Sequence, residues 1–119
     1  MPRTPKTSLF IRIQLPGGHR FGPGKAELLE AIARTGSISE AARSMGMSYR
    51  RAWLLVDSTN RLFRQPVVTA GPGGQRGGGA TLTTFGRQVL RRYRHLIAAA
   101  GRAASADLAR FADWRKPNS

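Results

Sequence analysis

The sequence has no cysteine among its 119 residues. Disulfide scaffolds, thiolate metal sites and cysteine nucleophiles are therefore excluded together. Histidine is almost as scarce: His19 and His95 stand far apart, with few carboxylates near either. This ligand set is too small for a transition-metal site, and we predict no metal and no cofactor.

Long apolar runs are also missing. No stretch approaches the roughly 18 to 20 residues of a membrane span. The basic start of the chain leads into only a short apolar segment, which does not resemble a secretory signal. We therefore expect a soluble, cytoplasmic protein with no membrane partner.

Negative charge is scarce as well. Six acids stand against 20 bases, which gives a formal net charge of +14, and segment 58–106 holds eight arginines and no carboxylate. Seventeen of the bases are arginine, whose planar fork matches phosphates and guanine edges. A coding bias would explain arginine over lysine, but it would not explain the missing acids. We therefore predict a polyanionic partner, with nucleic acid favoured over a membrane surface.

The hydrophobic pattern predicts one mainly α-helical domain with a small β-hairpin. We expect a strand at 8–15, helices at 25–34, 38–45 and 49–63, short strands at 67–69 and 80–83, and a long final helix with Gly101 as a candidate kink. The predicted layout is a basic tail at 1–7, a winged helix-turn-helix domain at 8–83, a dimerisation helix at 84–116 and a disordered tail at 117–119.

Capping residues define the central pair of helices. Ser37 and Glu40 fit a capping box, in which the Ser37 hydroxyl accepts from the Glu40 amide and the Glu40 carboxylate accepts from the Ser37 amide. Gly46 suits the end of that helix, and Ser48 is the expected N-cap of the next one. Two capped helices joined by a short turn form a helix-turn-helix.

A glycine-rich hairpin and a further helix complete the plan of a winged helix. The DNA major groove is about 12 Å wide and admits one α-helix, whose N-terminal residues meet base edges. Glycines at the hairpin tip let the backbone approach phosphates or the minor groove. The predicted DNA-binding residues are Ser37, Ser48, Tyr49, Arg50, Arg51, Trp53, Gln75, Arg76, Gly77 and Gly78. Candidate phosphate contacts are Arg34, Arg43, Arg61, Arg64 and Arg76.

Several of these residues occur in motifs that resemble the DNA-binding domain of the molybdate-responsive ModE-type regulators, which belong to the LysR-like winged-helix group. The resemblance runs from about residue 8 to about residue 100. Its motifs are 36–42 (GSISEAA), 47–53 (MSYRRAW), Asn60 with Leu62, 77–83 (GGGATLT) and 85–86 (FG).

The resemblance implies a dimeric transcription regulator that binds a palindromic operator. It also implies that the final helix and helix 25–34 take part in dimerisation, and the length of the final helix relative to so small a core favours a dimer. The predicted dimerisation residues are Leu28, Val89, Tyr93, Leu96, Ile97 and Ala100. Family members sense molybdate through C-terminal β-barrel domains, and no strand-rich segment follows the final helix here. Molybdate binding by this chain is therefore not expected.

Four residues of the predicted helix 49–63 have two interpretations each. Tyr49 either packs between helices or presents its hydroxyl to a phosphate. Trp53 is either buried, as most tryptophans are, or close to DNA, as the resemblance implies. Leu54 and Leu55 form either the edge of the core or a contact for a partner protein.

The leading hypothesis is a sequence-specific regulator that binds double-stranded DNA as a homodimer. A nucleoid-type protein that coats DNA with little sequence preference is the second. An adaptor that docks on another regulator through Leu54 and Leu55 or the final helix is the third. An enzyme is not expected, because no paired carboxylates, nucleophile with a base or Walker motif can be assembled from these residues.

Overall fold

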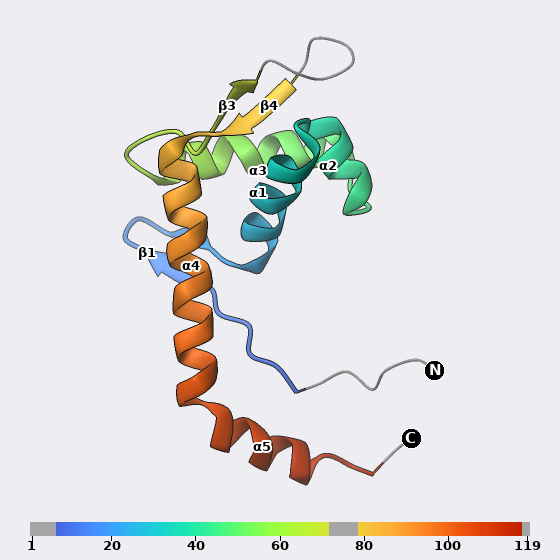
Figure 1. Ribbon diagram of the computed structural model, residues 1–119, viewed down its shortest axis with the longest axis vertical. Coiled ribbons are helices and arrows are strands. Elements are labelled where there is room, and N and C mark those ends of the chain that lie inside the picture. Colours follow the sequence, from blue (N-terminus) through green and yellow to red (C-terminus); the bar gives the residue numbers. More distant parts are fainter. Residues whose placement is uncertain (1–6, 72–78, 118–119) are drawn as a thin grey trace.

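The computed structural model describes residues 7–71 and 79–117, and these form five helices and two antiparallel hairpins (Figure 1). The predicted fold class, mainly α with a small β wing, is confirmed. In chain order the elements are β1 (Ile13–Leu15), β2 (His19–Phe21), α1 (Pro23–Thr35), α2 (Ile38–Ser44), α3 (Tyr49–Leu62), β3 (Val68–Gly71), β4 (Gly79–Leu82), α4 (Thr84–Ala103) and α5 (Ser105–Trp114).

The N-terminal segment differs from the prediction. Only Ile13–Leu15 of the expected strand at 8–15 pairs with another strand, and its partner β2 was not predicted. Gly17 and Gly18 both have positive φ, +89° and +81°, which lets the chain reverse directly after β1. The sequence did not predict β2 because its three residues are too few to show a strand period.

The central helices form the predicted helix-turn-helix. α1 ends at Gly36, whose φ of +73° belongs to the left-handed region and whose N–H donates to the Ile32 carbonyl at 2.8 Å. Between α2 and α3, Gly46 has a φ of +67° and turns the chain. Both glycines lie where the sequence predicts a helix end.

The capping box at the start of α2 is only half formed. The Ser37 hydroxyl accepts from the Glu40 amide at 3.1 Å, as predicted. The Ser37 amide, however, donates to the Thr35 hydroxyl at 3.4 Å, and the Glu40 side chain is exposed. The expected carboxylate partner is thus replaced by a threonine on the preceding turn.

Aromatic side chains connect the hairpin β1–β2 to the rest of the core. The rings of Phe21 and Tyr93 meet edge to face with centroids 5.1 Å apart, and Phe21 meets Phe63 in the same way at 5.6 Å. The Tyr93 hydroxyl donates to the Ile11 carbonyl at 2.5 Å, which fixes the chain before β1 against α4. Phe21 is buried, although it lies outside every element that the sequence predicts.

The wing hairpin β3–β4 is attached to the helices at both of its strands. The Asn60 side chain accepts from the Val67 and Val68 amides at 2.8 and 3.1 Å and donates to the Val68 carbonyl at 3.1 Å. On the other strand, the Ala80 amide donates to the Gly36 carbonyl at 2.9 Å. These bonds fix the base of the wing relative to α1 and α3.

The last two helices extend away from this body (Figure 1). The Thr83 hydroxyl accepts from the Gly86 amide at 2.8 Å and caps α4. The helix continues through Gly101, and the interruption expected there lies instead at Ala104, between α4 and α5. None of the helices in the described part of the chain is long and apolar enough to span a membrane.

Candidate nucleic-acid interface

Helix α3 has one buried face and one exposed face. Ala52, Val56 and Thr59 are buried against α1 and α2, as their spacing predicts. The other side of the helix carries exposed basic and aromatic residues. This helix can therefore reach another molecule without unfolding any part of the core.

The start of α3 concentrates the predicted contact residues. The Ser48 hydroxyl accepts from the Arg51 amide at 3.1 Å and caps the helix, as expected. Tyr49 is 56% exposed and Trp53 47% exposed. These values exclude the buried alternative for both side chains. Because they are four residues apart, the two rings lie on the same side of the helix.

Arg50 and Arg51 are exposed beside them. Leu54 and Leu55, farther along α3, differ in burial. Leu54 is exposed, whereas Leu55 packs against the core. The interpretation of a core edge is therefore right for Leu55 only.

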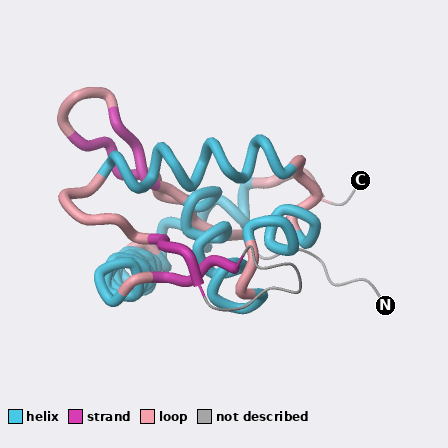
Figure 2. The backbone as a smooth tube through the Cα atoms, turned by 90° about the horizontal axis from the view of Figure 1, so that it is seen from above, coloured by secondary structure: helices cyan, strands magenta, loops and turns pink. Residues whose placement is uncertain are grey.

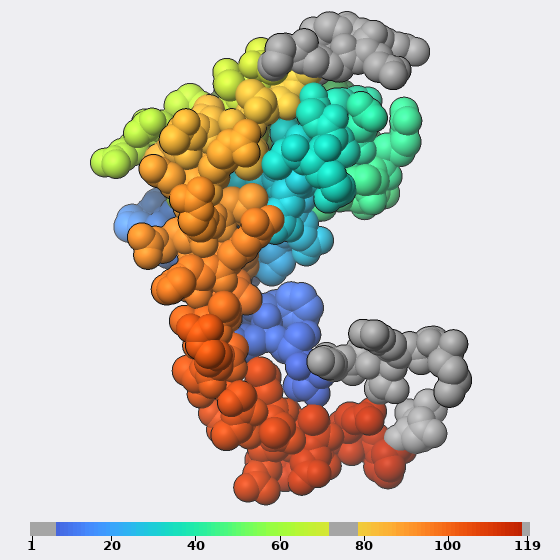
Figure 3. Space-filling view, in the orientation of Figure 1, coloured from blue at the N-terminus to red at the C-terminus, as the bar shows by residue number. Residues whose placement is uncertain are grey.

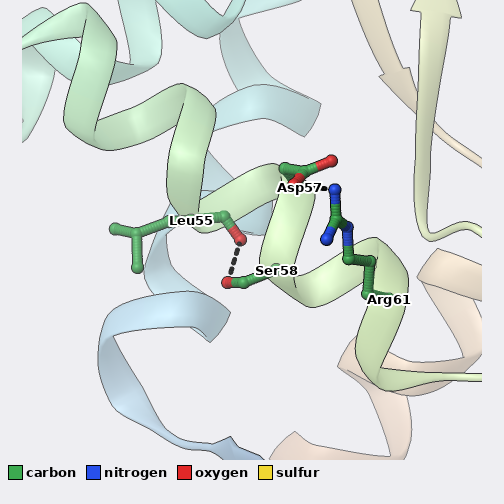
Figure 4. Close-up of polar contacts among 4 residues, drawn as sticks. All are labelled: Leu55, Asp57, Ser58 and Arg61. Atoms are coloured by element: carbon green, nitrogen blue, oxygen red, sulfur yellow. Dashed lines mark hydrogen bonds and ion pairs between the residues drawn. The ribbon is translucent and has the colours of Figure 1, made fainter.

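The second half of α3 is shown in Figure 4. Asp57, the only acid of this helix, forms an ion pair with Arg61 at 3.2 Å. On another side of the helix, the Ser58 hydroxyl donates to the Leu55 carbonyl at 3.1 Å. The single negative charge of α3 is thus paired, and the exposed face of the helix has a positive balance.

Ser37 does not belong to this exposed surface. It is only 7% exposed, its hydroxyl and amide are both hydrogen-bonded within the chain, and it forms a β-bridge with Gly79. We therefore replace the predicted DNA contact at Ser37 with a structural role in holding the wing. The predicted tip residues Gln75, Arg76, Gly77 and Gly78 lie outside the described residues, as does most of the basic tail at 1–7 and the end of the tail at 117–119.

The predicted dimerisation residues fall into two groups. Leu28 is 1% exposed inside the protomer. A side chain buried this deeply cannot reach a second subunit, so Leu28 belongs to the core instead. Tyr93 is also buried, whereas Val89, Leu96, Ile97 and Ala100 are half-buried along α4.

Helix α5 presents an apolar surface that the sequence analysis did not single out as a site. None of its residues is buried, and Phe111 and Trp114 are 64% and 67% exposed. Their rings contact each other edge to face, with centroids 5.5 Å apart. The spacing predicted a helix here, but a spacing alone does not show whether other parts of the chain cover it. Figure 3 shows the end of α4 and α5 projecting from the body of the molecule.

Comparison with known proteins assigns the helix-turn-helix to a family. Residues 24–87, which run from the start of α1 into the first turn of α4, match the bacterial regulatory helix-turn-helix proteins of the lysR family. The chain belongs to this family. Membership confirms the prediction of a regulatory helix-turn-helix protein rather than an enzyme.

Within the lysR family, the relatives also confirm the ModE resemblance. The chain is 53% identical over 76 residues to the molybdenum-pterin-binding protein MopB of Rhodobacter capsulatus, covering 64% of this chain and 28% of MopB. It is 39% identical over 71 residues to the DNA-binding transcriptional dual regulator ModE of Escherichia coli K12, covering 60% of this chain and 27% of ModE. The chain thus matches less than a third of the length of these relatives.

A solved structure supports the lysR-family fold. The crystal structure of a complex between CbnR_DBD and DNA matches 76% of this chain and 95% of that chain, with a TM-score of 0.57 and 21% identity. At this identity the likeness concerns the fold. It confirms the winged-helix fold, mainly α with a small β wing.

Proposed function

We propose that this lysR-family chain binds double-stranded DNA as a transcription regulator in the bacterial cytoplasm, with the start of α3 in the major groove. The observation that carries the proposal is the exposed group at the capped start of α3. Tyr49, Arg50, Arg51 and Trp53 are all exposed there, on a helix whose opposite face is buried. A rigid helix with basic residues near its N-terminus suits the dimensions of the major groove.

The residues of this group have different roles in the proposal. Arg50 and Arg51 supply bidentate donors for guanine edges or phosphates. Tyr49 and Trp53 contribute flat apolar surface and one polar atom each next to the arginines. Ser48 caps the helix and fixes the direction of its first turn. The wing tip, with Gln75, Arg76, Gly77 and Gly78, contacts the backbone or the minor groove.

The proposed regulator is a homodimer that recognises a palindromic site. Two observations support a second copy. Val89, Leu96, Ile97 and Ala100 are half-buried on α4, and Phe111 and Trp114 are exposed on α5. The radius of gyration is 16.9 Å, whereas a compact domain of this length has about 13.5 Å. A protomer this extended leaves apolar surface for a partner to cover.

Several relatives are named for molybdenum. Those names describe proteins more than three times as long as the segment that this chain matches. Our proposal for this chain is therefore confined to DNA.

Selection of bound duplexes from random sequence tests the proposal. We expect a palindromic site, a steep loss of affinity with salt, and binding at least about 1,000 times tighter than to bulk DNA. Replacing Arg50 or Arg51 by alanine should reduce the base preference at one position by about 1 to 3 kcal/mol. Arg102→Ala, at an exposed position near the end of α4, is the matched control.

Two outcomes would contradict the proposal of a sequence-specific regulator. An affinity ratio near one between the selected site and bulk DNA would favour the nucleoid-type protein. No binding at low salt, together with co-purification of another regulator, would favour the adaptor.

A further inference from the structure

A groove of about 500 Å³ runs between the β1–β2 hairpin, the start of α1 and one side of α3. Four basic side chains line it: Arg12 before β1, Arg20 in β2, Lys25 in α1 and Arg51 in α3. No Asp or Glu is among the described residues of its wall. Of the four, the proposed function uses only Arg51, so this surface carries cations to which no role has been assigned.

The register of the hairpin explains why two of these arginines face the groove. Ile13 pairs with Phe21, which is buried in the core. Because side chains alternate along a strand, Arg12 and Arg20 lie on the opposite face. The stem of Arg12 rests on Gly22, where an added Cβ would come within 3.1 Å of the Arg12 Cγ. Glycine at this position thus lets Arg12 lie close to the start of α1.

Lys25 is held in the same groove from the side of α1. Its Nζ donates to the Arg20 carbonyl at 2.6 Å, a contact that uses one of its three N–H groups. Burial, followed by the positive charge of Arg20, lowers the pKa of Lys25 from its usual value. The smaller of the two causes, the like charge of Arg20, shows that the two cations repel each other in this groove. The amino end of α1 adds to the same potential.

The groove and the wing lie on different flanks of α3. Leu55 and Ser58 line the groove, whereas Asn60 holds the wing strand β3. At about 100° per residue, Asn60 lies roughly 140° to 160° around the helix from these two residues. Figure 2 shows the two hairpins as separate strand pairs. A helix in the major groove has a phosphate backbone on either side of it, and the wing accounts for only one of them.

We propose that this groove binds a phosphodiester of the DNA backbone, on the flank of α3 opposite the wing, through Arg12, Arg20 and Lys25. The inference rests on the proposed function. It makes the β1–β2 hairpin a second backbone contact beside the recognition helix. These cations add affinity and fix the orientation of the protein, but they do not read bases.

The test compares the double variant Arg12→Gln/Arg20→Gln with wild type and with Arg102→Gln, in the full chain. Anisotropy titrations with the selected duplex between 50 and 300 mM salt give the dependence of affinity on salt. We expect the slope of log K against log salt to fall by about one per subunit, because each groove loses its contact to one phosphodiester. The ratio of affinities for the selected site and bulk DNA should change less than about threefold. Circular dichroism melting checks that the variants fold.

The outcomes separate this inference from the proposed function. If wild type binds the selected site and Arg50→Ala relaxes its base preference, but the double variant has the salt slope of Arg102→Gln, only the groove proposal fails. Failure of wild type to bind duplex DNA overturns both. Binding of inorganic phosphate by the free protein, lost in the double variant while DNA affinity is unchanged, would assign the groove to a small anion and overturn the proposal.

Discussion

The body of the molecule, residues 13–90, and its arm, residues 91–114, bury their apolar side chains to very different degrees. In the body, Leu28, Leu29 and Ile32 of α1 are at most 1% exposed, and β4 and α3 pack around them. Among the described residues of the arm, only Tyr93 is buried, and no residue of α5 is buried. The body therefore encloses its own apolar core, whereas the described residues leave the apolar surface of the arm exposed.

Polar contacts follow the same division. In the body, Asn60 and Thr83 connect separate parts of the fold through side-chain bonds to the backbone. Near the junction, Arg94 pairs with Glu30 through its Nε at 2.6 Å and through one Nη. Both groups of this pair are partly exposed, so it adds at most about 1 kcal/mol. The position of the arm thus depends on a few contacts near its base.

The largest expected effect is on the free energy of unfolding, when one of two glycines of α4 is replaced by alanine. A Cβ at Gly86 would lie 2.2 Å from the Val67 carbonyl oxygen, whereas one at Gly101 would meet nothing within 4 Å. Gly86→Ala should therefore destabilise the fold by about 3 kcal/mol. Gly101→Ala should stabilise it by about 0.5 to 1 kcal/mol, because alanine suits a helix interior better. Urea denaturation measures both, and equal effects would contradict the division into body and arm.

A smaller effect is expected at the base of the wing. Asn60→Ala removes three hydrogen bonds to the backbone around the buried Val67 and Val68. Leaving these groups without partners should lower the free energy of unfolding by about 2 kcal/mol. Ser58→Ala, on an exposed part of the same helix, is the control and should change it by less than about 0.5 kcal/mol. If Asn60→Ala and Ser58→Ala change the free energy of unfolding equally, Asn60 does not hold the wing.

In the arm, the expected change concerns association. Replacing both Phe111 and Trp114 by alanine should raise the dissociation constant of the proposed dimer at least about tenfold, which corresponds to about 1.4 kcal/mol. Leu54→Ala, which removes an exposed apolar side chain from the body, should leave the constant unchanged. Sedimentation equilibrium measures it. An unchanged constant in the double variant would show that the aromatic pair is not part of a dimer surface.

The smallest effect concerns pH. Burial, with a further contribution from Glu27, raises the pKa of Tyr93 above its usual value of 10.0. The unfolded chain then loses the phenolic proton first, so the stabilisation is full below about pH 10 and is lost as the pH rises through the folded pKa. Tyr93→Phe should cost about 1 kcal/mol at neutral pH and weaken this alkaline loss. Tyr49→Phe, at an exposed position, is the control and should keep the alkaline loss of stability. Thermal unfolding from pH 8 to 11 measures this loss in both variants.

The sequence predicted α1 to α4 and the wing strands because each has a clear local signal. Ser37, Ser48 and Thr83 cap their helices, and Gly36 and Gly46 end α1 and turn the chain after α2. Exposed basic residues at the start of α3 also followed from spacing alone. β2, by contrast, is too short to show a period, and its role depends on the distant ring of Tyr93.

The sequence by itself determined the charge, the helix-turn-helix and the residues at the start of its second helix. Only the tertiary structure decided that Ser37 and Leu28 are buried, that Tyr49 and Trp53 are exposed, and that Arg12 and Arg20 face the groove beside α3. The physical reason is that caps and periodicity act over a few residues. Burial and the clustering of like charges depend on elements that are distant in the chain and meet only when it folds.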